Sequence, residues 1–252
     1  MPEHRFHTPE PVELEIKIPA GDIDIETVEG DESFLSLDGL DKLIEMTEVR
    51  QDGRRIVVEL KGKKSFGLTI SIGDFNFGPG GLRVRARVPH GSTTNLATTS
   101  ADMKLRGRVQ SLEVKTVSGD LVVNGEIERE ATVKTMSGDV RFERVGGELR
   151  VQTISGDVTA RSVGGSIVAK SVSGDFRVES AREGYVTAQS VSGDIELGVP
   201  AGTHLDVDAG SVSGDLASEV PLGSEPGADT SDGPTLVVRG KTVSGDFRVF
   251  RA

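Results

Sequence analysis

The chain of 252 residues contains no cysteine, no tryptophan and one tyrosine. Without cysteine it can form no disulfide, carry out no thiol chemistry and build no thiolate metal site. Aromatic residues make up only 4% of the chain. That is little material for the centre of a wide globule, which large side chains usually fill, or for stacking on sugars. The deficit favours a narrow fold whose interior is made of small and branched side chains.

Positive charge and long apolar runs are also scarce. The chain has 29 Lys and Arg against 40 Asp and Glu, a net charge of −11. This balance argues against nucleic acid and against anionic lipid, because both attract clustered basic residues. No apolar run approaches the roughly 20 residues that span a bilayer, and residues 1–21 lack the pattern of a secretory signal. We therefore expect a cytoplasmic protein with no membrane span and no nucleic-acid partner.

What the chain has in abundance is the tripeptide Ser-Gly-Asp. Seven copies occur, with steps of 19, 18, 18, 19, 21 and 31 residues between successive Asp residues, and Ser100-Ala101-Asp102 is a degenerate eighth copy. The seven Asp residues are Asp120, Asp139, Asp157, Asp175, Asp194, Asp215 and Asp246. A turn that recurs at a nearly fixed period indicates a solenoid, in which one supersecondary unit stacks on the next.

Aligning the copies gives columns that specify the repeating unit. The residue before Ser is always apolar, the residue before that is always Thr or Ser, and the residue after Asp is always apolar. A long polar residue usually precedes the Thr or Ser, with Gly210 as an exception, and Ser218 interrupts the apolar column three residues after Asp. Alternation of this kind indicates half-buried strands. We predict an all-β fold, a parallel β-solenoid of about 18–19 residues per coil, closed by an N-terminal β cap.

Three expectations concern the turns. Glycine is expected because a tight reversal needs positive φ. Each Asp is expected to accept hydrogen bonds from backbone N–H groups of its own turn. Each Thr or Ser hydroxyl is expected to point inward and to meet its neighbour one coil away.

The sequence divides into two predicted parts. Residues 1–90 are the predicted cap with the first irregular coils, and residues 91–252 the regular stack, with a Pro-rich acidic loop inserted at 218–234. Within the cap, strands are predicted at Ile56–Leu60, Leu68–Ile72 and Leu82–Val88. Phe66, Phe75 and Phe77, placed among glycines, form either a hairpin over the cap or an exposed apolar lip that could bind a partner.

The runs KTVSGDLVV, KTMSGDVRF, QTISGDVTA, KSVSGDFRV and QSVSGDIEL, with the opening GDIDIETVEGD, resemble a bacterial putative-adhesin family of β-strand-repeat proteins, a domain-of-unknown-function family. The resemblance covers nearly the whole chain. It implies a parallel β-solenoid and, for some relatives, a link to the cell envelope. It supplies no catalytic residues.

The Asp column leaves a second interpretation open. Adjacent carboxylates about 4.8 Å apart repel one another, so backbone hydrogen bonds or calcium ions must offset the repulsion. The first is the structural interpretation, and the second would make Asp120, Asp139, Asp157, Asp175, Asp194, Asp215 and Asp246 a row of metal ligands. No His or Ser has the partners of a catalytic triad or a zinc site. We therefore expect no enzyme activity and no cofactor.

The chain ends on a predicted strand, Phe247–Ala252, with nothing after it to cover it. An uncovered strand is a template for pairing, so Phe247, Val249 and Phe250 are a predicted contact with a second subunit. The sequence thus predicts a non-enzymatic scaffold that presents a regular face to a protein or glycan. The alternatives are a self-assembling polymer joined through the last coil and a calcium-stabilised rod.

Overall fold

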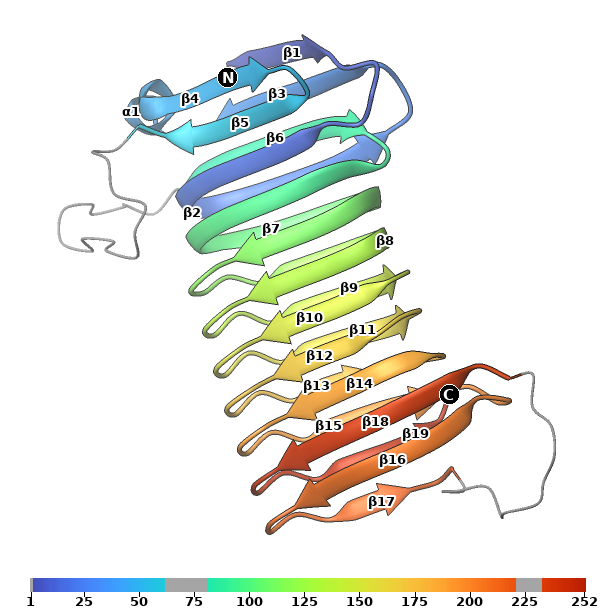
Figure 1. Cartoon of the computed structure of the whole chain (residues 1–252). Coiled ribbons are helices and arrows are strands. Elements are labelled where there is room, and N and C mark those ends of the chain that lie inside the picture. The colour runs from blue at the N-terminus through green and yellow to red at the C-terminus, as the bar shows by residue number, and fades with distance from the viewer. Residues whose placement is uncertain (1, 62–80, 221–232) are drawn as a thin grey trace.

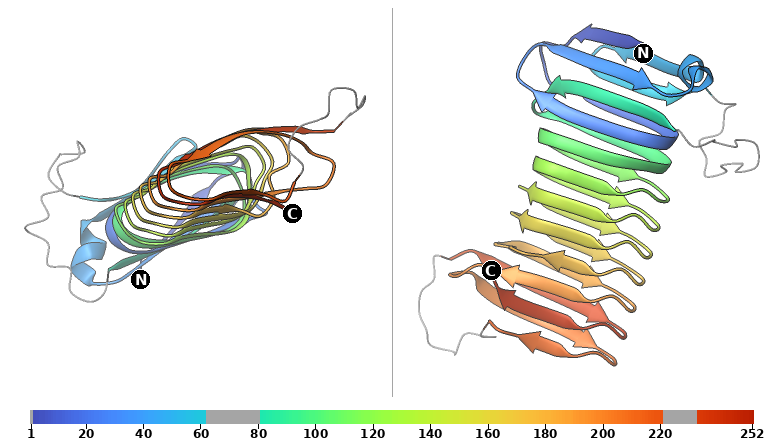
Figure 2. Two further views of the ribbon diagram at one scale, coloured as in Figure 1. Left: turned by 90° about the horizontal axis from the view of Figure 1, so that it is seen from below. Right: turned by 180° about the vertical axis from the view of Figure 1, so that it is seen from behind.

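The computed structural model describes residues 2–61, 81–220 and 233–252. Strands of this chain join into one sheet that winds into a stack of flattened coils. Figure 1 shows the coils one below another. The left view of Figure 2 looks along the stack and shows that each coil is a narrow oval with two walls. The chain is therefore all-β and mostly parallel.

Each regular coil contributes one strand to each wall. The first wall contains β10 (Glu148–Gln152), β12 (Ile167–Lys170), β14 (Gly184–Gln189), β16 (His204–Ser211) and β18 (Thr235–Thr242). The second contains β9 (Val140–Val145), β11 (Val158–Val163), β13 (Phe176–Val178), β15 (Ile195–Val199), β17 (Leu216–Ser218) and β19 (Phe247–Arg251). The long strands β7 (Ser92–Lys115) and β8 (Leu121–Lys134) bend through both walls, because each pairs first with one wall and then with the other.

The alternation predicted from the columns fills the space between the walls. Residues directly above one another in register are both inward or both outward, as in the pairs Val158 with Phe176 and Thr159 with Arg177. Val158 is 2% exposed and Phe176 4%. Val, Leu, Ile and Ala make up most of the core, with Phe142, Phe176 and Phe247 among them. Two walls this close leave room for few large rings, which explains the low aromatic content.

The N-terminal end departs from the parallel pattern. β2 (Glu13–Val28) pairs in parallel with β5 (Arg55–Leu60), β6 (Leu82–Pro89) and β7. Antiparallel pairs join β1 (Glu3–His7) to β3 (Glu32–Asp38), β3 to β6, and β4 (Thr47–Asp52) to β5. The short helix α1 (Asp41–Met46) lies beside β4 and buries no residue. The predicted strands at 56–60 and 82–88 are confirmed, and the one at 68–72 lies outside the described residues. The division of the chain at residue 90 stays a prediction.

The last coil of the sequence is not the last coil of the stack. β18 pairs with β14 on one side and with β16 on the other, and β19 likewise lies between β15 and β17. Figure 1 shows this inserted coil, β18 and β19, one level above the end coil, β16 and β17. The prediction that Phe247–Ala252 is an uncovered end strand is therefore wrong. The 31-residue step before Asp246 accompanies this return of the chain into the stack.

Composition explains which coil lies at the end. The inserted coil turns Leu236, Val238, Phe247 and Val249 inward, and all four are at most 2% exposed. In the end coil the positions in register with Phe247 and Val249 are the smaller Leu216 and the polar Ser218. The more apolar coil gains more from two neighbours than from one, so the poorer coil takes the end, as a terminal capping repeat does.

Close approach between coils accounts for the turn glycines. A Cβ on Gly156 would lie 2.1 Å from the carbonyl oxygen of Gly138, one coil away, and Gly174 has the same distance to Gly156. Among the Ser-Gly-Asp glycines only Gly119 has a left-handed φ, at +108°. The expectation that these turns need glycine for positive φ is thus wrong for six of the seven. They need it because a side chain would separate the coils.

Candidate functional site

The Ser-Gly-Asp turns stack into one edge of the molecule, and each presents an apolar side chain to solvent. We call these seven side chains the turn row; in stack order they are Val117, Met136, Ile154, Val172, Val191, Val243 and Val212. They are 37%, 48%, 45%, 46%, 47%, 47% and 81% exposed, respectively. At about 4.8 Å per coil the row is about 29 Å long. A contiguous line of exposed apolar side chains often marks an interaction site.

The Thr or Ser column closes each turn from within. Thr153 Oγ1 accepts a hydrogen bond from the N–H of Gly156 at 2.9 Å, and Ser171 Oγ accepts one from Gly174 at 2.8 Å. Thr135, Ser190, Ser211 and Thr242 make the same bond to the glycine three residues later. The hydroxyls point inward as predicted, but the N–H groups that donate to them belong to their own turn. The expected ladder from coil to coil is wrong for this column.

The Asp column provides the contact between coils. Asp157 Oδ1 accepts a hydrogen bond from the N–H of Asp175 at 3.0 Å, and Asp175 Oδ1 accepts one from Asp194 at 2.9 Å. The chain of bonds runs from Asp102 through Asp120, Asp139, Asp157, Asp175, Asp194 and Asp246 to Asp215. The predicted bond within the same turn is therefore wrong, because the donor lies in the next coil. Backbone dipoles directed at each carboxylate offset the repulsion along the column.

Replacing one Asp in the middle of this column should weaken the stack. We expect Asp157→Ala to lower the free energy of unfolding by about 1–2 kcal/mol, because the N–H of Asp175 loses a charged acceptor. Asp157→Asn retains an oxygen at this position and should cost less than about 0.5 kcal/mol. Urea unfolding of both variants measures the difference. Equal losses would show that the hydrogen bond is not what the Asp contributes.

The serines between the apolar residue and glycine complete the edge. The N–H of Ser173 donates to the carbonyl oxygen of Ile154 at 2.8 Å, and the Ser173 hydroxyl donates to the same oxygen at 3.2 Å. Ser155, Ser192, Ser213 and Ser244 repeat this pair of bonds to the coil before them in the stack. The polar backbone of the edge is therefore largely satisfied within the protein, and side chains are what it offers to a partner.

The Asp column continues into the first coils. Ala20, Gly21 and Asp22 lie in register with Ser100, Ala101 and Asp102. On the other side of Asp22, Arg83 donates two hydrogen bonds to its Oδ2, at 3.1 and 3.0 Å. An arginine thus ends the row of carboxylates on the N-terminal side. Arg106 pairs with Asp24 and Arg87 with Glu26 in the same region, so neighbouring acids there are also neutralised.

The predicted interaction residues lie in different environments in the structure. Phe247 and Val249 are 2% and 1% exposed, so they are core residues of the inserted coil and cannot form the predicted contact. Phe250 is half-buried beneath Arg177, whose guanidinium carbon lies 5.3 Å from the ring centroid. Phe66, Phe75 and Phe77 lie outside the described residues. The turn row, which the structure exposes, was visible in the sequence as the invariably apolar position before Ser.

The described residues contain no candidate metal site. They contain no group of three Asp, Glu, His or Cys side chains arranged to hold a metal ion. The calcium hypothesis for the Asp column therefore rests on the repeat alone.

Burial disfavours ionisation of Glu15, yet Lys17 and Arg55 outweigh this and hold the pKa of its carboxyl below the ordinary value. That carboxylate joins β2 to β5, which is a structural role.

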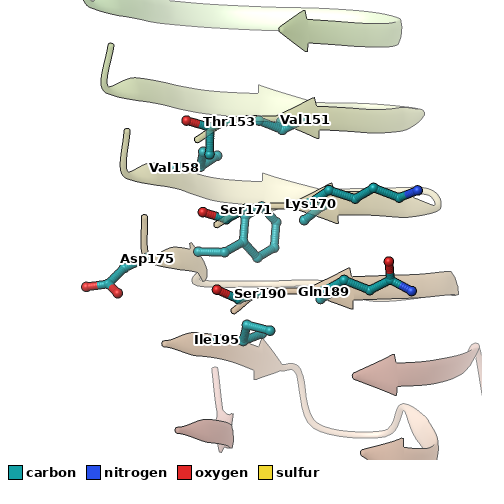
Figure 3. Close-up of a pocket in the computed structure, with 12 residues that line it drawn as sticks. Val151, Thr153, Val158, Lys170, Ser171, Asp175, Gln189, Ser190 and Ile195 are labelled. Carbon is teal, nitrogen blue, oxygen red and sulfur yellow. The ribbon is translucent and has the colours of Figure 1, made fainter. Parts of the chain in front are cut away.

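The enclosed void found between the walls in the described residues is small. A void of about 10 Å³ lies inside the Ser-Gly-Asp edge, between Thr153, Phe176 and Ser190. Figure 3 shows the side chains of Thr153, Ser171 and Ser190 one above another, with the Asp175 carboxylate directed away from the lining residues. Such a volume accepts about one water molecule. A ligand larger than a water molecule does not fit this void.

No helix in the described residues is long and apolar enough to cross a membrane.

The fold is that of a repeat protein built from stacked, mostly parallel β-coils. The family model named Toastrack DUF4097 matches residues 13–249, and the chain belongs to this family. This confirms the resemblance deduced from the repeats.

Solved structures show the same fold. A putative adhesin from Bacteroides fragilis is 15% identical with a TM-score of 0.58, and the match covers 98% of this chain and 95% of that one. A putative lipid binding protein from Parabacteroides distasonis is 15% identical with a TM-score of 0.64, covering 98% and 96%. At such identity the likeness concerns the fold alone. No match was found among curated proteins.

Proposed function

We propose that this chain is a non-enzymatic β-solenoid scaffold, adhesin-like in its mode of action, and that a protein partner binds along its Ser-Gly-Asp edge. The observation that carries the proposal is the turn row. Of the ten large hydrophobic side chains that are exposed in the described residues, seven belong to it. A regular stack could place polar residues at these positions without loss of packing, since the side chains point outward.

The chemistry of the edge favours a protein over the other partner classes. Its backbone groups are already bonded to neighbouring coils, so binding depends on apolar contact with Val, Ile and Met side chains. The row contains no aromatic ring, which a glycan partner would need for stacking. The net charge of −11 opposes nucleic acid and anionic bilayers.

The relatives' names support two kinds of binding, and the structure favours one of them. One structural neighbour is named a lipid binding protein, but the interior void of about 10 Å³ holds no acyl chain. An adhesin binds through its surface, which agrees with the exposed row. We therefore place the partner outside the stack, on the edge.

The experiment is site-specific photo-crosslinking in the cells that make the protein. A photoreactive residue at position 172, in the middle of the row, should form one dominant adduct with another protein. The same residue in place of Arg161, an exposed side chain of β11 away from the row, should not.

The matching variant changes the row without disturbing the core. We expect Ile154→Asp, introduced together with the photoreactive residue at 172, to reduce the adduct at least tenfold, about 1.4 kcal/mol of binding free energy. Ile154 is 45% exposed, so the melting temperature should change little. Equal adducts from positions 172 and 161 would eliminate the edge as the binding surface.

A further inference from the structure

The end coil is a place where a pair of core strands has a neighbour on one side only. Among the described strands, β16 pairs with β18 alone and β17 pairs with β19 alone. Figure 1 shows both strands at the bottom of the stack. Their side chains reflect this position, since Leu216 is 53% exposed while Phe247, its partner in register, is 2% exposed.

No described strand covers the hydrophobic interior at this end of the stack. Leu205, Val207 and Ala209 are half-buried and pack against the core from β16. Together with Leu216 they form an apolar strip between the two walls. In the coils above, the corresponding residues are closed off by the next coil: Leu236 and Val238, in register with Leu205 and Val207, are 0% exposed.

Backbone N–H and C=O groups at this end are also placed to pair with another strand. The carbonyl of Asp215 accepts from Phe247 N–H at 3.0 Å, and the N–H of Glu219 donates to Val249 at 2.9 Å. Alternate residues of a parallel strand bond to the same side. The N–H and C=O groups of Leu216 and Ser218 therefore point away from β19, toward the outside of the stack, where an unpaired edge is a template for another strand.

The opposite end of the molecule has a different architecture. There the stack is covered by β1, β3, β4 and β5 in antiparallel pairs, with α1 beside them. The end coil thus meets no matching two-walled edge in a head-to-tail arrangement. A matching edge, with two walls at the same separation, is the end coil of another copy.

We propose that the end coil is a docking surface for the end coil of a second copy, giving a closed two-fold dimer. A two-fold axis perpendicular to the stack reverses strand direction, so the strands pair antiparallel across the interface. The apolar strips of Leu205, Val207 and Leu216 then cover each other. The contact is isologous and both open ends are used, so assembly stops at two chains.

Two of the acidic side chains of the end coil are neutralised within the chain, whereas Asp206 and Asp215 have no ion pair among the described residues. Asp208 in β16 is paired with Arg239 at 3.0 Å, and Glu219 next to β17 is paired with Arg248. Both pairs join the end coil to the inserted coil within one chain, and they reduce the repulsion between two acidic copies. The interface is small, because β16 has eight residues and spans about 26 Å at 3.3 Å per residue. Small interfaces of this kind are weak and reversible.

Light scattering over a concentration series tests the dimer. The wild-type mass should rise from that of one chain, 26.7 kDa, and level off at twice that value. Leu216→Asp should weaken dimerisation at least tenfold, because it places a charge in the shared apolar strip. Tyr185→Asp, a matched change at an exposed side chain of β14 with 67% exposure, should dimerise like wild type. A wild-type monomer at every concentration, growth beyond two chains, or unaltered dimerisation of Leu216→Asp would overturn the proposal.

Crosslinking at single cysteines provides a second measurement that does not depend on how well Leu216→Asp folds. The natural chain has no cysteine, so each variant carries one thiol. Ala217→Cys, exposed in the end coil, should be joined between copies by a short bis-maleimide. Gln152→Cys, exposed in β10 far from that end, should not. Equal crosslinking at the two positions would place the contact elsewhere.

Discussion

Gly156→Ala is expected to be one of the most damaging single substitutions in this chain, lowering the free energy of unfolding by about 3 kcal/mol. Its new Cβ would lie 2.1 Å from the carbonyl oxygen of Gly138 and 2.8 Å from the carbonyl carbon. Both atoms belong to the backbone of the adjacent coil, which cannot rotate away as a side chain does. The coils must separate locally, which also strains the hydrogen bond from the N–H of Asp157 to Asp139 Oδ1, at 3.1 Å between the same two coils.

Gly210→Ala is the matched control. A Cβ on Gly210 would meet no atom within 4 Å, and its φ is not left-handed. Alanine lowers the conformational entropy of the unfolded chain, so this variant should be as stable as wild type or more stable by up to about 1 kcal/mol. Urea unfolding midpoints of the two variants give the comparison. Similar midpoints would mean that the coils are spaced more widely than the structure has them.

Phe247→Ala is expected to lower the free energy of unfolding by about 3–5 kcal/mol, as deletion of a buried aromatic ring does. Phe247 is 2% exposed, and its ring packs over Gly240, where a Cβ would lie 2.2 Å from a ring carbon. The size of the loss comes from the inserted position of this coil. At the uncovered end of a stack the same ring would be partly in solvent, and its removal would cost much less.

Leu216→Ala is the comparison that makes the experiment decisive. Leu216 lies in register with Phe247 in the adjacent coil, but it is 53% exposed. Its truncation should cost less than about 1 kcal/mol. If the coils were instead stacked in the order of the sequence, Phe247 would lie at the end and Leu216 inside. The larger loss would then belong to Leu216→Ala.

Part of the site could have been read from the sequence more fully. The residue before Ser is apolar in every copy, and the structure shows this side chain exposed from Val117 to Val212. In a turn, an apolar residue that directly follows the inward-facing hydroxyl has to point outward. The alternation of inward and outward residues is therefore enough to predict that the turn row is exposed. The two exceptions to the columns, Gly210 and Ser218, likewise marked the coil that tolerates an open end.

Other features could not be obtained from the sequence. The Thr or Ser and the Asp both offer an oxygen near the same turn, and spacing does not tell which bonds locally and which bonds across coils. That depends on the approach of adjacent backbones, which places the Asp175 N–H 3.0 Å from Asp157 Oδ1. Nor does spacing say which glycines need a positive φ and which need only the absence of a Cβ.

The sequence by itself determined the repeating unit: its period, its two turns, its inward and outward faces and its all-β class. These are local properties, since each follows from the order of side chains within about 18 residues. Only the tertiary structure decided the order of the coils. The turns of the last two coils have nearly the same sequence, SVSGD and TVSGD, so either could follow β14 and β15 with almost the same hydrogen bonds. Two sets of side chains compete for the inner position: Phe247, Val249, Leu236 and Val238 of one coil, and Leu216, Ser218, Leu205 and Val207 of the other. The difference in their total burial selects the order of the coils. That total depends on contacts between coils far apart in the chain.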